Sequence, residues 1–146
     1  MVVVVSALIA QVLIGEVLIS PWWAPNLVLV GLVIAVGSSP QRWFRYACVT
    51  GLFTIAWSVR ASWAILLVWC LFGWCVSRVS QRWDLTDRRV QCVVCGVGSL
   101  FLTFITLWFD DLFTFPLLGL AVVHAAMTSL SVPLSAIVAR RLRGST

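Results

Sequence analysis

Lysine is absent from this chain of 146 residues, and charged residues of every kind are scarce. Asp, Glu, Lys and Arg together make up 10% of the sequence, whereas a soluble domain carries about 25%. The longest polar stretch is Ser77–Arg89, which is too short to form a soluble catalytic module. These shortages exclude a soluble domain and leave room for one integral membrane domain over residues 1–146.

The sequence also lacks the usual signatures of enzymes. It has no phosphate-binding Walker loop, no nucleophile elbow and no pair of carboxylates deep in an apolar run. We therefore expect neither catalysis nor a cofactor, and the remaining classes are a scaffold, an adaptor or a carrier of small molecules. The N-terminal run Met1–Ile14 lacks a basic segment and is followed by no small-residue cleavage site, so it predicts a retained first helix rather than a signal peptide.

Long apolar runs fill most of the chain. Hydrophobic residues make up 62% of the sequence, and the mean hydropathy is +1.06. A membrane-spanning helix needs about 20 mostly apolar residues, and fewer where neighbouring helices shield it. The pattern predicts an all-α membrane protein with six transmembrane helices in a compact bundle. The stretches free of Asp, Glu, Lys and Arg are 1–15, 17–41, 46–59, 61–77, 90–109 and 112–139.

The arginines give this bundle an orientation. With six spans and the N-terminus inside, nine of the ten fall on the inner side and only Arg60 falls outside. Basic residues collect on the cytoplasmic side of membrane proteins, so both termini are predicted to be cytoplasmic. A net charge of +5 then indicates contact with anionic lipid of the inner leaflet rather than with nucleic acid. The inner arginines are Arg42, Arg45, Arg78, Arg82, Arg88, Arg89, Arg140, Arg141 and Arg143.

Helices 2 to 4 are predicted to be short. Helix 2 is expected to start at about Pro25, within the outer turn Ser20–Asn26, and to end near Gly37. At a rise of about 1.5 Å per residue, it covers only about 20 Å, so we expect a shielded or broken element. The other expected helices are 2–20, 43–59, 62–76, 90–109 and 112–139, the last with Pro133 inside it.

Five cysteines raise the possibility of redox or metal chemistry. Cys92 and Cys95 have the spacing of thiol oxidoreductases and zinc knuckles. The predicted topology places them on the inner side, whereas disulfides persist outside, and a zinc site needs two further ligands. Cysteine also acts as a small packing residue in apolar helices, and we favour that interpretation.

A few ionisable residues are predicted to lie in or near the membrane. Glu16 is positioned to pair with Arg60 and so to orient the first helix against the third and fourth. His124, the single histidine, is a functional candidate by its location, but a neutral hydrogen bond between helices is the more ordinary role. The adjacent Asp110 and Asp111 suggest a cap on the last helix, with acid–base work or a cation site as the alternative.

Small residues four apart mark faces where helices can approach closely. On helix 2 these residues are Gly31 and Ala35, and we expect them to line a lipid-facing groove for the single transmembrane helix of a partner. Similar pairs occur on the last two helices, at Cys92 and Gly96 and at Ala125 and Ser129.

Five short motifs stand out along the chain, namely Pro25-Asn26-Leu27, Pro40-Gln41-Arg42, Gly51-Leu52, Ser131-Val132-Pro133-Leu134 and Arg140-Arg141-Leu142-Arg143. Together they resemble the MreD family of rod-shape-determining membrane proteins, which is similar in length and in its six predicted helices. The chain departs from the family after Gly51-Leu52, where the usual aspartate and glycine are replaced by Phe53–Ala56 and Ser58–Ala61.

The resemblance implies a non-enzymatic subunit of the bacterial cell-elongation machinery in the cytoplasmic membrane. Such a subunit pairs with a bitopic MreC-type protein and belongs with a RodA-type glycosyltransferase and a class B penicillin-binding protein. The candidate partner-binding residues are then Pro25, Asn26, Gly31, Ala35 and Gly51. The alternative is a substrate-binding subunit of an energy-coupling-factor vitamin transporter, which would need a polar outer pocket and a small-residue face on helix 1.

Overall fold

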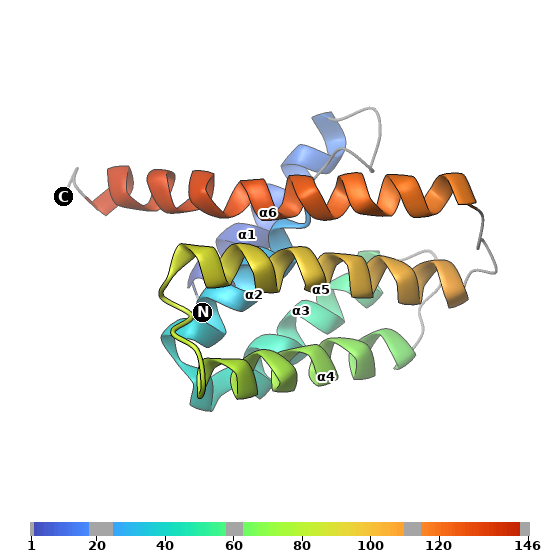
Figure 1. Ribbon diagram of the computed structural model, residues 1–146. Coiled ribbons are helices and arrows are strands. Elements are labelled where there is room, and N and C mark those ends of the chain that lie inside the picture. The colour runs from blue at the N-terminus through green and yellow to red at the C-terminus, as the bar shows by residue number, and fades with distance from the viewer. Residues whose placement is uncertain (1, 18–24, 58–62, 110–114, 144–146) are drawn as a thin grey trace.

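The computed structural model describes residues 2–17, 25–57, 63–109 and 115–143, with side chains for 2–14, 25–56, 63–108 and 116–134. Every regular element in these ranges is a helix. The six α-helices are joined by short connections and one 3-10 turn, η1 (Figure 1). Their bounds are α1 Val2–Val17, α2 Leu27–Ser38, η1 Pro40–Arg42, α3 Trp43–Trp57, α4 Trp63–Ser80, α5 Arg88–Phe109 and α6 Phe115–Arg143.

Over the described residues, the all-helical prediction and the count of six helices are confirmed, whereas six membrane spans stay a prediction. Three helical stretches are long and apolar enough to cross a membrane, namely Trp63–Ser80, Arg88–Trp108 and Pro116–Leu134. The prediction that helix 4 is short is wrong, because α4 continues four residues past the predicted end at Val76 and carries Arg78 in its last turn. The polar residues in the last turn of α4 lie at the end of the bundle, where a helix can extend beyond the hydrocarbon core of a membrane.

The helices pack as antiparallel pairs around α2. The pairs α3–α4 and α5–α6 run side by side in Figure 1, and α1 lies against α2. The connection between α4 and α5 lies at the same end of the bundle as η1 and the end of α6. We call this end, which carries Arg42, Arg45, Arg78, Arg82, Arg88 and Arg89, the basic end.

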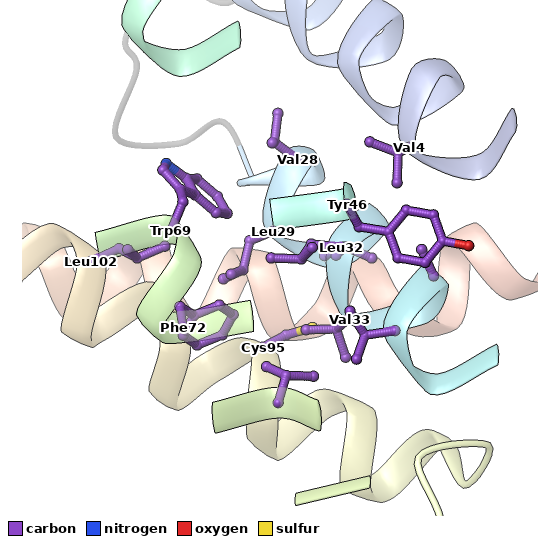
Figure 2. Close-up of a cluster of buried hydrophobic side chains, with 14 of the residues drawn as sticks. Val4, Val28, Leu29, Leu32, Val33, Tyr46, Trp69, Phe72, Cys95 and Leu102 are labelled. Atoms are coloured by element: carbon purple, nitrogen blue, oxygen red, sulfur yellow. The ribbon is translucent and has the colours of Figure 1, made fainter. Parts of the chain in front are cut away.

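Helix α2 forms the centre of the core. Its sequence is apolar on every side, which is typical of a helix buried all round. Leu29, Leu32 and Val33 are fully enclosed, and Figure 2 shows them among side chains from the surrounding helices. The prediction that helix 2 is shielded is therefore confirmed, and its own neighbours provide the shielding. The residues labelled around it include Val4, Tyr46, Trp69, Phe72, Cys95 and Leu102.

The outer surface of the bundle is also apolar. On α4 the exposed large side chains Trp63, Leu67, Leu71 and Trp74 follow each other at helical spacing along one face. Comparable residues are exposed on α1, α5 and α6. Because lipid tails are as apolar as these side chains, close packing and hydrogen bonds between helices must hold the bundle together.

Candidate functional site

The most unusual feature of the bundle is the depth at which α2 begins. The backbone N–H of Asn26 donates to Oγ1 of Thr128 at 3.0 Å, and that hydroxyl lies 3.4 Å from Oγ of Ser99. Ser99 is halfway along α5, and Thr128 is halfway along α6. Helix α2 therefore begins at mid-depth and runs only to the basic end, where the Cβ position of Gly37 lies 3.1 Å from Cβ of Leu85.

This location corrects two predictions. Asn26 does not lie in an outer turn, and α2 starts after Asn26 rather than at Pro25. The physical reason is the Asn26 side chain, whose Oδ1 accepts from the Leu29 N–H at 3.0 Å and so caps the helix. The tryptophans at 22 and 23, which we placed in the same turn, lie outside the described residues.

Polar side chains of α1 and α6 accept hydrogen bonds from the start of α2, and a hydroxyl of α5 contacts the one on α6. Oε1 of Gln11 on α1 accepts from the Leu27 N–H at 2.7 Å, and Thr128 on α6 accepts from Asn26. Thr128 also donates to the His124 carbonyl at 2.8 Å, which fixes its hydroxyl. We call Gln11, Asn26, Ser99 and Thr128 the central polar cluster. A helix end inside an apolar bundle needs such partners, because no water is available to satisfy its free N–H groups.

The chemistry of the central polar cluster is that of amides and hydroxyls. Gln11, Asn26 and Thr128 accept from backbone N–H groups at the start of α2, and the hydroxyls of Ser99 and Thr128 lie within hydrogen-bonding distance, so the cluster joins α1, α2, α5 and α6. Sequence reasoning missed Gln11 and Ser99. Gln11 carried a usable signal, since it is an amide within the apolar run Val2–Ile14.

Gly31 and Gly51 are contact points between helices within the chain. A Cβ on Gly31 would lie 2.5 Å from Cβ of Ala7 on α1, and Gly31 and Ala35 are both buried. The predicted lipid-facing position of these two residues is wrong, because α1 occupies that face of α2. Gly51 has the same role on α3, where a Cβ would lie 2.7 Å from Cδ1 of Leu66 on α4.

Helices α5 and α6 meet through the small pairs that the sequence indicated. A Cβ on Gly96 would lie 2.5 Å from Oγ of Ser129, and Ser129 donates to the Cys92 carbonyl at 2.9 Å. Cys95 is fully buried in the core beside α2. The CxxC residues thus occupy packing positions in the structure, with Cys92 only partly exposed.

Sequence reasoning also missed a pair of thiols between α3 and α4. The side chains of Cys48 and Cys70 are neighbours across these two helices, and both residues are half-buried. Within the described residues, no group of three or more His, Cys, Asp and Glu side chains could hold a metal ion.

Other candidate residues can be placed only in part. His124 lies on α6 one turn before Thr128 and is half-buried, and its carbonyl takes part in the hydrogen bonding described above. The side chain of Glu16 and the whole of Arg60, Asp110 and Asp111 lie outside the described residues, so their predicted pairing and capping stay predictions.

Comparisons with protein families, with curated proteins and with solved structures find no match to this chain.

Proposed function

We propose that this chain is a non-catalytic scaffold subunit of the bacterial cell-elongation machinery, with six helices in the cytoplasmic membrane and both termini in the cytoplasm. Its partners would be an MreC-type bitopic protein, a RodA-type glycosyltransferase and a class B penicillin-binding protein. It would act by presenting a firmly packed helical surface to the transmembrane helices of these partners.

One observation carries this proposal: residues of the resembling motifs stand at the junctions of the bundle. Asn26 caps α2 at the central polar cluster, and Gly51 forms the contact of α3 with α4. The Pro40-Gln41-Arg42 motif forms η1, whose Pro40 carbonyl accepts from Ser77 on α4 at 3.3 Å. Because the resembling motifs lie where helices contact one another, they support a similar architecture. A similar architecture in turn supports a similar scaffold role.

The vitamin-carrier alternative has less support from α1. A carrier would expose a small-residue face on this helix to its coupling partner. Here Ala7 faces inward against Gly31, and the exposed large residues of α1 are Val2, Val3, Val5, Ile9 and Leu13. The polar side chains near the start of α2 are engaged in joining helices, which also favours a scaffold.

Purification from native membranes in a mild detergent tests the proposal. We expect the tagged chain to retain an MreC-type protein, identified by mass spectrometry, that an equally tagged multi-pass protein of similar size does not retain. The purified chain is tested in parallel for binding of small vitamins by calorimetry. Tight vitamin binding by a chain that retains none of the expected partners would replace the scaffold with the carrier.

A further inference from the structure

The segment around η1 and the connection between α4 and α5 both contribute to the surface of the basic end. Leu85, in the connection between α4 and α5, is 3% exposed and packs against Gly37 at the end of α2. Its carbonyl accepts from Nε2 of Gln91 at 2.6 Å, and Ser77 donates to Pro40. These contacts bring the arginines of η1 and α3 to the same end as those of α4 and α5.

This surface keeps a positive charge. Its described side chains include six arginines and two acids, Asp84 and Asp87, which leaves a net charge of +4 among them. Both acids bind nearby turns: Asp84 accepts from the N–H and hydroxyl of Thr86, and Asp87 accepts from the Arg89 N–H at 2.9 Å. The hydrogen bonds from Thr86 lower the pKa of Asp84, which therefore stays ionised at neutral pH.

Arg78 lies where this basic surface meets the lipid-facing side of the bundle. The Arg78 guanidinium lies over the Trp74 ring, 5.5 Å from its centroid. Trp74 continues the exposed face of Leu67 and Leu71, which is apolar as a lipid contact must be. A stacked guanidinium keeps its N–H donors in its own plane, where they fit the oxygens of a phosphate.

Two further residues extend this site toward the solvent. Arg82 is exposed one turn beyond Arg78, and Trp83 is 63% exposed beside it. Indole rings favour the level of lipid headgroups, between hydrocarbon and water. The combination of two arginines and two exposed tryptophans at the end of a lipid-facing helix face is therefore suited to a headgroup at the membrane boundary.

We propose that Arg78 and Arg82, flanked by Trp74 and Trp83, bind the phosphate of an anionic phospholipid at the basic end of α4. The lipid is favoured over an acidic protein because the site continues an apolar face that a soluble partner would not cover. This site is independent of the scaffold role and would be present in a carrier as well.

Native mass spectrometry of the full chain in detergent, titrated with phosphatidylglycerol or phosphatidylcholine, tests the proposal. A basic residue near an anionic lipid surface contributes about 1 kcal/mol, or about fivefold in affinity. We expect R78Q/R82Q to weaken phosphatidylglycerol binding by about 25-fold and Trp74→Leu by a few-fold. Phosphatidylcholine should bind more weakly than phosphatidylglycerol to the unmodified chain.

The matched control is R88Q/R89Q, which removes the same charge at the start of α5 and should weaken binding less than threefold. All these side chains are at least partly exposed, so thermal unfolding in the same detergent should stay unchanged. Equal losses of phosphatidylglycerol affinity in both double variants would indicate general electrostatic attraction to the basic end and overturn the proposal. Displacement of the lipid by a short polyglutamate peptide at lower concentration would assign the surface to an acidic protein instead.

Discussion

Individual residues at the start of α2 stabilise this short helix inside the bundle. Asn26 caps the helix, and Gln11 and Thr128 accept from the N–H groups of Leu27 and Asn26. In water the solvent would share this task, but in an apolar interior an unsatisfied N–H costs about 1–3 kcal/mol. Gly31 provides the space that α1 needs to pack closely against α2.

Replacing Thr128 by Val should lower the free energy of unfolding by about 1–3 kcal/mol, because the valine keeps the shape but leaves the Asn26 N–H without its acceptor. The control is Thr106→Val on α5, whose hydroxyl donates only to the Leu102 carbonyl of its own helix. Denaturant-induced unfolding in detergent measures both. Equal stabilities of the two variants would contradict the role given to Thr128.

Replacing Gly31 by Ala should cost about 1–3 kcal/mol, since the new methyl group overlaps Ala7. Gly119→Ala is the matched control, because a Cβ there meets no atom within 4 Å. Adding Ala7→Gly to Gly31→Ala should restore part of the loss, and the double-mutant cycle measures this coupling. A Gly31→Ala variant as stable as Gly119→Ala would show that α1 does not pack here.

At the scale of elements, the contact between α3 and α4 depends on two glycines. Gly51 faces Leu66, and a Cβ on Gly73 would lie 2.8 Å from Cβ of Ala47. Between these two points, Cys48 and Cys70 are in contact across the helices. This pair was not predicted, because the CxxC spacing in the sequence says nothing about neighbours on different helices.

The contact between Cys48 and Cys70 predicts selective cross-linking. Treating membranes with a lipid-soluble thiol oxidant such as a quinone should link these two residues, because the two thiol protons and two electrons pass to the quinone and reduce it to the hydroquinone. Mass spectrometry of digested protein identifies the linked peptides, and Cys48→Ser should abolish the product. The exposed Cys75 on α4 provides the comparison. A predominant Cys70–Cys92 link would contradict the observed packing of α3 and α4.

At the scale of the whole molecule, the positions of the arginines and the arrangement of the helices together give the bundle one basic end. The six arginines with described side chains collect at one end of the bundle, together with the end of α6. Between the two ends lie helices with apolar outer faces, three of which are long enough to cross a membrane. The six-span topology rests on this polarity and remains a prediction.

Cysteine labelling of a cysteine-free variant tests the topology. Residues introduced at Gln81 and Ser145 should resist an impermeant thiol reagent added from outside and react after the membrane is opened. A cysteine at Asp111, which the sequence places in an outer loop, should react from outside. The expected pattern follows from the cost of moving the arginine-rich connection across the membrane. Labelling of position 81 in intact cells would overturn the orientation.

The sequence by itself determined the class of this protein and the approximate limits of its helices. Apolar runs of about 15–30 residues leave only helix as a way to satisfy the backbone in lipid, so composition and spacing were sufficient. The small residues on α5 and α6 were likewise visible, because close packing depends on residue size alone.

Only the tertiary structure decided the depth of α2 and the partners of its polar and small residues. Asn26 was predicted in an outer turn, yet Thr128, 102 residues away in sequence, holds it at mid-depth. Gly31 was predicted to face lipid, yet α1 folds back and covers it. The physical reason is that a hydrogen-bonding group can pair with any group of matching chemistry, and a glycine can accommodate any side chain of matching shape. The packing of all the helices together decides which residue becomes the partner.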